Sequence, residues 1–334
     1  MSSGLDILDD PPNEVKQELE NLKTQLYLEI PSKSLDSNLL VATWNIRSLS
    51  KLTRKWNAEE NDSPKRDLKA IRAIAEIIQC FDVIAIQEVR SHLYAFKEIV
   101  KALGSHWSFV LTDVTKGKKG NYERMAFLFD TRKLQMSGLA CELVVPPERL
   151  ESITSDSLIK QFARTPYAVG FKTINSPLKE IVSFVLVTLH VFYGEKPEDR
   201  IGELKEIAEW MSDWAKSEYA YDSNLIALGD FNIDRKDDPL YQAFTSTGLD
   251  VPEVLNRVPR TIFSDPGEAD TDHFYDQIAW FTEEGSTPPL SIRYKDGGGF
   301  DFTKSLYKNS GLTKTQISWK ISDHFPLWVE FDTS

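Results

Sequence analysis

Several apolar runs of the sequence end in side chains suited to metal binding or to acid–base chemistry. Carboxylate and amide oxygens are ligands that a hard divalent cation such as Mg²⁺ prefers. Histidines suit general acid–base catalysis or contacts with phosphate near neutral pH. The side chains concerned are Asn45, Glu88, His190, Asp230, Asn232, Asp276, Asp323 and His324.

Each of these residues also has a purely structural interpretation when it is taken alone. Asn45 could cap a turn, Glu88 could be a surface acid, and "GDFN" (229–232) could be a turn with glycine at positive φ. Taken together, strands that repeatedly end in such groups would place them along one edge of a sheet. The sequence has no Walker A loop, no Rossmann glycine fingerprint and no G-x-S-x-G elbow, which are typical of other enzyme classes.

The hydrophobic pattern predicts the elements that carry these side chains. Apolar runs predict buried strands within residues 38–46, 81–90, 123–130, 181–194, 223–234, 274–281 and 319–331. Helical spacing of apolar residues predicts helices over residues 13–28, 68–78 and 198–217. Residues 295–312 are rich in glycine and polar side chains, which predicts an insertion or a mobile loop.

Length and charge restrict the class of protein. A chain of 334 residues with 41% hydrophobic residues can bury a large core, and no Pro/Ser-rich linker divides it. We expect a tail and amphipathic helix over residues 1–38 and a single domain over residues 39–334. The formal net charge of −12 argues against a basic nucleic-acid coat, but it allows an enzyme that holds a divalent metal in an acidic cleft.

Cysteine content and the N-terminal segment bear on the compartment. Cys80 and Cys141 lie in apolar segments, and we expect both to be reduced structural residues. The N-terminus lacks the basic and apolar regions of a signal peptide, and no apolar run approaches the roughly 20 residues that span a bilayer. We therefore predict a cytoplasmic protein without membrane insertion, and no obligate protein partner is visible.

At this point the motifs carry a family resemblance. In chain order, "TWNIR", "IQEVR", "YERMAFLF", "TLHVF", "LGDFN", "YDQIAW" and "SDHFPL" resemble the endonuclease/exonuclease/phosphatase superfamily, and within it the deoxyribonuclease I-like branch. The resemblance covers residues 39–331. It implies an α/β fold, a four-layer sandwich of two mixed β-sheets flanked by helices, and metal-dependent hydrolysis of a phosphodiester.

The resemblance assigns the catalytic roles. His190 and His324 would flank the scissile phosphate, Glu123 would hold His190, and Asp276 would hold His324. Asp230 would orient or deprotonate the attacking water. A carboxylate beside each imidazole fixes its tautomer and raises its pKa, which keeps the ring cationic against phosphate.

The resemblance also assigns metal and phosphate ligands. Glu88 would be the principal metal ligand, and Asn45 and Asp323 would complete the environment of Mg²⁺, with Mn²⁺ or Ca²⁺ as alternatives. The residues expected to bind substrate phosphate are Asn232, Arg90 and Arg164.

The sequence departs from the family pattern near Glu123 and Asp276. A tyrosine of the family is expected two residues before Glu123, where this chain has Asn121, and Tyr122 lies between them. Gln277 stands where an arginine is frequent. A basic patch before the "YERM" segment is either a solvated loop or a phosphate contact; it contains Lys116, Lys118 and Lys119.

Three classes of function fit these observations. The first is a Mg²⁺-dependent endonuclease that cleaves DNA with little sequence preference, and an abasic-site endonuclease is a narrower variant. The second is a phosphoesterase that uses the same site on a phospholipid headgroup, an inositol phosphate or a nucleotide. The third is an inactive binding module, which the complete ionisable set disfavours. The partner expected is DNA or another phosphodiester substrate.

Overall fold

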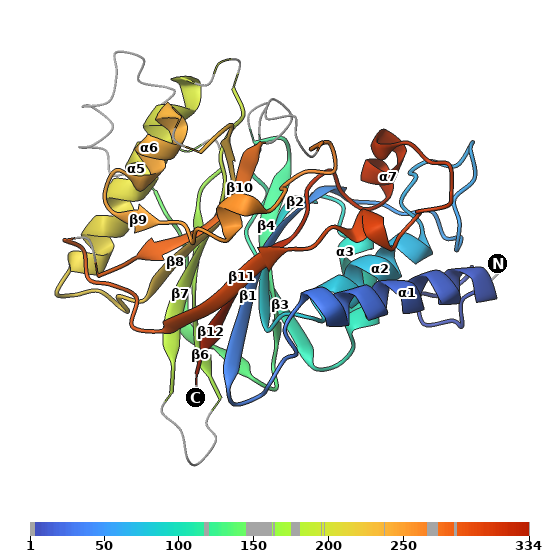
Figure 1. Cartoon of the computed structure of the whole chain (residues 1–334), viewed down its shortest axis with the longest axis horizontal. Helices are drawn as coiled ribbons and strands as arrows, with labels where there is room; N and C mark the ends of the chain where they lie inside the picture. Colours follow the sequence, from blue (N-terminus) through green and yellow to red (C-terminus); the bar gives the residue numbers. More distant parts are fainter. Residues whose placement is uncertain are drawn as a thin grey trace.

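The computed structural model in Figure 1 describes most of the chain, with short gaps. The described residues are 4–116, 120–144, 162, 164–174, 181–194, 196, 198–236, 238–265, 273–283 and 286–333.

Two mixed sheets of six strands each form the centre of the molecule. The first sheet has the order β11 (Arg293–Gly299), β12 (Leu327–Asp332), β1 (Asn38–Leu49), β2 (Val83–Arg90), β4 (Glu123–Asp130) and β3 (Trp107–Leu111). The second sheet has the order β5 (Leu134–Glu142), β6 (Tyr167–Thr173), β7 (Ser183–His190), β8 (Leu225–Ile233), β10 (Phe274–Phe281) and β9 (Leu249–Asp250). Among the strands that the structure describes, only the central pair of each sheet is parallel, namely β1 with β2 and β7 with β8.

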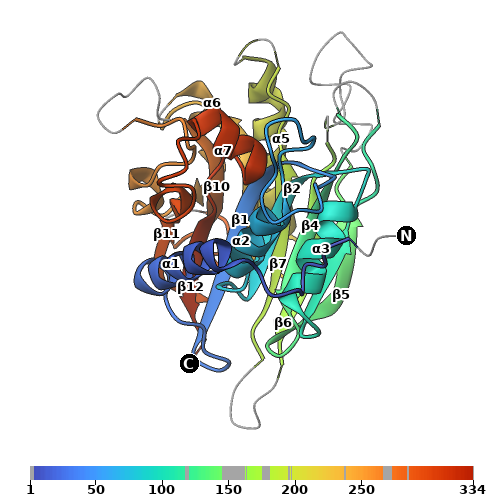
Figure 2. The same ribbon diagram turned by 90° about the vertical axis from the view of Figure 1, so that its right-hand side faces the viewer.

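Helices cover the outer face of each sheet, as Figures 1 and 2 show. The helices on the first sheet's side are α1 (Asn13–Glu29), α2 (Leu68–Ile78), α3 (Tyr94–Leu103) and α7 (Lys314–Lys320). Those on the second sheet's side are α5 (Glu198–Lys216) and α6 (Pro239–Thr245). The predicted four-layer sandwich is therefore confirmed.

The alternation of side chains along β1 explains why four layers form. Leu39 and Val41 belong to the core between the two sheets, whereas Leu40, Ala42 and Trp44 belong to the core beneath α1, α2 and α3. Successive residues of a strand point to opposite faces, so a strand that is apolar at every position is buried on both sides. The run "NLLVATW" encodes a central strand in this way.

Each parallel pair is built as a strand, a helix and a second strand. β1 leads through α2 into β2, and β7 leads through α5 into β8. Two parallel neighbours need such a crossover connection. Since the two pairs belong to facing sheets, the polar ends of four strands come together at one edge of the sandwich.

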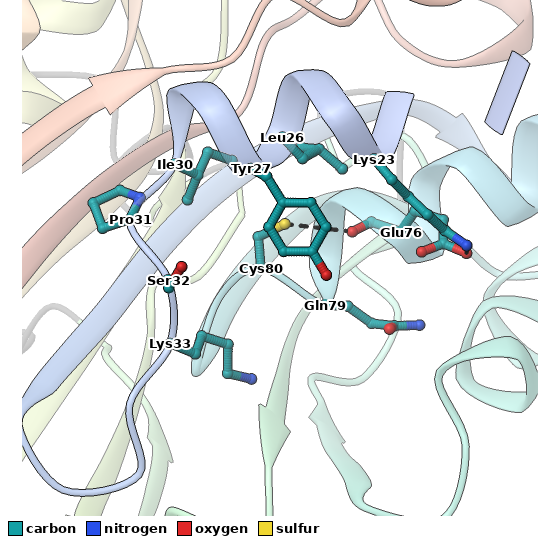
Figure 3. Close-up of a pocket in the computed structure, with 10 residues that line it drawn as sticks. All are labelled: Lys23, Leu26, Tyr27, Ile30, Pro31, Ser32, Lys33, Glu76, Gln79 and Cys80. Carbon is teal, nitrogen blue, oxygen red and sulfur yellow. Dashed lines mark hydrogen bonds and ion pairs between the residues drawn. The ribbon is translucent and has the colours of Figure 1, made fainter. Parts of the chain in front are cut away.

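Helix α1 packs into this architecture through one apolar stripe. Val15, Leu19, Leu22 and Leu26 are buried in the core that α1 shares with α2. A surface pocket between the C-terminal ends of α1 and α2 is lined by Ile30, Lys33 and Cys80 among others (Figure 3). Cys80 precedes β2 and Glu88 lies near the other end of that strand, so this pocket is remote from the predicted site. Within the described ranges, no helix has both the length and the apolar character needed to cross a membrane.

One prediction about the C-terminal quarter is wrong. The glycine-rich segment is not a mobile insertion at its start, because residues 293–299 form β11 and pair with β12. Glycine is required there by packing, since a Cβ on Gly298 would lie 2.9 Å from the Trp328 ring. The strand predicted within residues 319–331 is present as β12, and it is preceded by helix α7, which begins after the capping box of Thr313 and Gln316 and ends at Lys320.

Candidate active site

Strand register brings the predicted residues of the second sheet into one row. His190 of β7 is the register partner of Asp230 in β8, and Asp230 is the register partner of Asp276 in β10. In the facing sheet, Asn45 of β1 pairs with Gln87, which precedes Glu88 in β2. Asn38 pairs with Asp332 at the end of the sandwich where Figure 1 marks the C-terminus. The predicted site residues lie at the opposite end of the sandwich.

Glu123 lies at the start of β4 and is the anchor of the first imidazole. Its Oε2 atom is 3.0 Å from Nδ1 of His190 and 2.8 Å from Nε of Arg164, and its Oε1 atom is 3.2 Å from Nη1 of Arg90. Burial alone would raise the pKa of Glu123, but His190 and the two guanidinium groups outweigh it and lower the pKa to about 2. The group is therefore a permanent carboxylate that directs Nε2 of His190 toward the centre of the site.

His324 forms the second imidazole–carboxylate pair. Its Nδ1 lies 2.6 Å from Oδ2 of Asp276, which is fully buried. Burial opposes the charge on His324, but Asp276 and then Asp230 outweigh it and raise the pKa of His324 well above its usual value. Trp44 donates from Nε1 to the His324 carbonyl at 2.8 Å, which fixes the backbone of this segment. The imidazole is thus held as a cation in a preset orientation.

Asp230 lies between the two imidazoles. Its Oδ2 atom is 3.6 Å from Nε2 of His190 and 3.9 Å from Nε2 of His324, and it accepts a hydrogen bond from Nδ2 of Asn45 at 2.8 Å. The Asn232 backbone N–H donates to Oδ1 at 3.0 Å. Burial would raise the pKa of Asp230, but the two histidines and these donors lower it. Asp230 is therefore an ionised carboxylate suited to accept a proton or to orient water.

Glu88 and Asn45 form the part of the site that fits a divalent cation. Nδ2 of Asn45 is 3.4 Å from Oε1 of Glu88, and Oδ1 of Asn45 is a buried acceptor without a hydrogen-bond partner. Two hard oxygen donors side by side suit Mg²⁺. Asp323 lies 3.3 Å from Nη1 of Arg47, so its carboxylate is engaged in an ion pair. Across the ranges that the structure covers, no three acidic, histidine or cysteine side chains are grouped to hold a metal.

The residues predicted to bind phosphate are held by protein groups. Arg90 and Arg164 both contact Glu123, and Arg90 also donates to the Asn121 carbonyl at 2.6 Å and to the Ser48 hydroxyl at 3.0 Å. Nδ2 of Asn232 donates to the Val191 carbonyl at 2.7 Å. Arg164 also donates from Nη1 to the His190 carbonyl at 3.4 Å, so these contacts lie on the His190 side of the site. The phosphate role of the three residues stays a prediction. Lys118 and Lys119 of the basic patch lie outside the described residues.

Several structural features that the motifs did not reveal also shape the site. Glu88 has φ +60° and lies where the pairing of β2 with both neighbours shifts register, so a bulge turns its carboxylate out of the regular strand. Asn121 donates from Nδ2 to Oε1 of Glu123 at 2.6 Å. Arg66, which is buried, donates to the carbonyls of residues 47, 48, 320 and 321 and thereby joins the segments that carry Asn45 and Asp323. Glu88 and Asn121 both have positive φ although neither is a glycine, and no sequence pattern indicated this backbone conformation.

The fold and the paired imidazoles and carboxylates define a phosphoester hydrolase of the two-sheet sandwich class. A sequence profile of the Endonuclease/Exonuclease/phosphatase family matches residues 42–324. The chain belongs to this family, whose members hydrolyse phosphoester bonds and generally use divalent metal ions.

One sequence relative and two proteins of solved structure illustrate the similarity, and the two solved structures share the fold. A protein named deoxyribonuclease from Thioalkalivibrio sp. (strain K90mix) is 26% identical over 315 residues, covering 92% of this chain and 74% of the relative. A family protein of solved structure from Bacteroides thetaiotaomicron has a TM-score of 0.58 at 20% identity, covering 90% of this chain and 99% of that one. The mannosyl-6-phosphatase of the strain VPI-5482 of that species has a TM-score of 0.54 at 19% identity, covering 88% and 99%.

Proposed function

We propose that this protein is a divalent-metal-dependent endonuclease that hydrolyses DNA phosphodiester bonds with little sequence preference. The observation that carries the proposal is the convergence of two imidazole–carboxylate pairs on Asp230. Oδ2 of Asp230 lies 3.6 Å from Nε2 of His190 and 3.9 Å from Nε2 of His324. Such a site can bind an anionic phosphate, accept the proton of a water molecule and return a proton to the leaving oxygen.

In the proposed mechanism the phosphate lies between the two imidazoles. The cationic His324 donates a hydrogen bond to a phosphate oxygen, and Asp230 accepts the proton of the water that attacks phosphorus. His190, held by Glu123, protonates the leaving oxygen as its bond to phosphorus breaks. Glu88 and Asn45 would hold the metal, for which Mg²⁺ is the proposed ion and Mn²⁺ or Ca²⁺ the alternatives; when bound, it neutralises charge on the phosphate.

Phosphate contacts complete the proposal. An amide NH₂ has two donors, so Asn232 can bind the Val191 carbonyl and a phosphate oxygen at the same time. We assign Arg90 and Arg164 a double role, because both contact Glu123, the carboxylate that holds His190, and both would also bind a phosphate oxygen of the substrate. Asp323 would reach the metal after leaving its ion pair with Arg47.

The choice of DNA is supported by the relative named deoxyribonuclease, at 26% identity. The net charge of −12 favours the second candidate, a phosphoesterase that acts on a small non-nucleic substrate, because a long polyanion gains little from an acidic protein surface. The two candidates use the same residues and differ only in the groups attached to the phosphate.

Incubation with supercoiled plasmid, in Mg²⁺ or in chelator, separates these candidates. We expect metal-dependent nicking that His190→Ala abolishes. Well-folded wild-type protein that leaves the plasmid intact in Mg²⁺ and in Mn²⁺ would refute the nuclease. Hydrolysis of a sugar phosphate, an inositol phosphate or a nucleotide by the same preparation would then support the second candidate.

A further inference from the structure

A chain of aromatic rings leads outward from the catalytic histidine pair. The ring of Tyr275 lies 5.7 Å from the ring of His324, measured between centroids, and the ring of Tyr193 lies 6.3 Å from that of Tyr275. The ring of His273 stacks on Tyr275 at 4.7 Å with an interplanar angle of 6°. The mechanism proposed above uses none of these three outer rings.

A buried arginine holds the outermost ring in place. The guanidinium of Arg200 lies over the Tyr193 ring, 4.6 Å from its centroid, and is itself buried. Arg200 donates to the Asn232 carbonyl, and its Nη2 donates to Oδ2 of Asp234 at 3.0 Å. One face of the Tyr193 ring therefore packs on Arg200, which is itself bound to strand β8 through the Asn232 carbonyl. The side chain of Tyr193 then loses little conformational freedom when a ligand binds.

The surface of Tyr193 is nevertheless open. The residue is 52% exposed, although Arg200 covers one face of its ring. A preset, half-exposed aromatic ring beside a phosphodiester site suits a flat aromatic group attached to the phosphate. In a nucleic acid that group is the base, and every base offers a π-face irrespective of its sequence.

We propose that Tyr193 is the stacking site for the base of a nucleotide that flanks the scissile phosphate. This inference rests on the proposed nuclease function and adds a substrate preference to it. A base can lie on Tyr193 only after it leaves its neighbours in a duplex, so unpaired strands, loops and mismatches are cut faster than intact duplex.

Cleavage of an end-labelled single strand tests the stacking site bond by bond. In a second strand, one central nucleotide is replaced by a tetrahydrofuran abasic residue, which keeps the backbone and removes the base. For the wild type in Mg²⁺, we expect one bond flanking that residue to be cut roughly 5- to 150-fold more slowly than the same bond in the intact strand, the range of one base–aromatic stack. Phosphodiester bonds of the same strand that lie far from the abasic residue should be cut at the same rate in both strands. They serve as an internal control for DNA binding and for loading of the enzyme with metal.

Variants at Tyr193 identify the ring responsible. Tyr193→Ala should cut intact and abasic strands at equal rates, whereas Tyr193→Phe should keep the difference seen in the wild type. Tyr219→Ala is the matched control, because Tyr219 is 94% exposed. Tyr193→Ala should also lose the preference for a mismatched over a matched duplex, while its cleavage of the abasic strand equals that of the wild type and shows that it is folded.

Each result has a distinct meaning. An unchanged abasic effect in Tyr193→Ala, with DNA cleavage intact, would overturn the stacking site and leave the nuclease proposal standing. A wild-type protein that cuts neither strand in Mg²⁺ or Mn²⁺ would overturn both. A loss that is equal on intact and abasic strands would mean that Tyr193 supports the backbone or the sugar, and it would also overturn the stacking proposal.

Discussion

Replacement of Asp276 by asparagine removes one charge from the site at almost constant size. Oδ2 of Asp276 lies 2.6 Å from Nδ1 of His324, and both groups are shielded from solvent. The carboxylate is the main reason that the pKa of His324 is raised against the effect of burial. Without it, burial and the loss of the ion pair both favour the neutral imidazole.

The size of the effect follows from the charge that is lost. An opposite charge at this separation shifts a pKa by roughly 1–3 units, and each unit corresponds to about 1.36 kcal/mol or a tenfold change in population. Between the two pKa values the cationic fraction of His324 in the variant falls about tenfold for each pH unit above the new pKa, and the full factor is reached only when the pH exceeds both pKa values. We therefore expect kcat/KM of Asp276→Asn to fall below that of the wild type as the pH rises above the new pKa, by roughly 10- to 1,000-fold at most.

The sign of the pH dependence separates this cause from misfolding. The raised pKa of His324 keeps the wild type cationic as the pH increases, so the deficit of the variant should widen with pH and shrink toward acidic pH. Rates of oligonucleotide cleavage across the pH range measure this, and NMR titration of the His324 ring measures its pKa directly. Asp222→Asn is the matched control, because Asp222 accepts a hydrogen bond from the Ser183 hydroxyl at the opposite end of the second sheet. A deficit that is constant across the pH range would refute the reasoning.

Three further perturbations test other parts of the site and its support. Glu88→Gln should raise the Mg²⁺ concentration for half-maximal nicking by at least about tenfold, and an unchanged Mg²⁺ titration would contradict its role as ligand. Arg66→Met should lower the free energy of unfolding in urea by about 3 kcal/mol, since four buried or partly buried carbonyls lose their donor, and a loss below about 1 kcal/mol would contradict that. Gly229 has φ +147° and a Cβ there would lie 2.1 Å from the Leu189 carbonyl oxygen, so Gly229→Ala should destabilise by about 2 kcal/mol or more; an unchanged Tm would contradict this.

The central strands could be predicted from the sequence because they are buried on both faces. "VIAIQ" and "LIALG" are apolar at successive positions, which is typical of parallel central strands. Strand β11 could not be predicted in this way, since Gly297, Gly298 and Gly299 have no side chains to form a pattern. Its existence depends on tertiary packing against Trp328, which a local window does not contain.

The site was predictable in its residue types and less so in its geometry. The order of polar strand ends indicated which residues meet, and the registers bring His190, Asp230 and Asp276 together. The bulge that turns Glu88 depends on pairing with two neighbours at once. Arg66 lies in a charged segment, and its carbonyl partners come from distant parts of the chain, so no spacing rule indicated its role.

The charge of the site explains how an acidic protein can be matched to an anionic substrate. The carboxylates at the centre are Glu88, Glu123, Asp230, Asp276 and Asp323, and the cations that contact them are Arg47, Arg90, Arg164 and His324. Each of these cations is already paired with a carboxylate, so the protein alone offers a phosphodiester little uncompensated positive charge. A divalent cation beside Glu88 and Asn45 would reverse that balance locally. In the proposed enzyme the positive charge for the substrate would be borne by the ion and not by a basic surface, which is compatible with the net charge of −12.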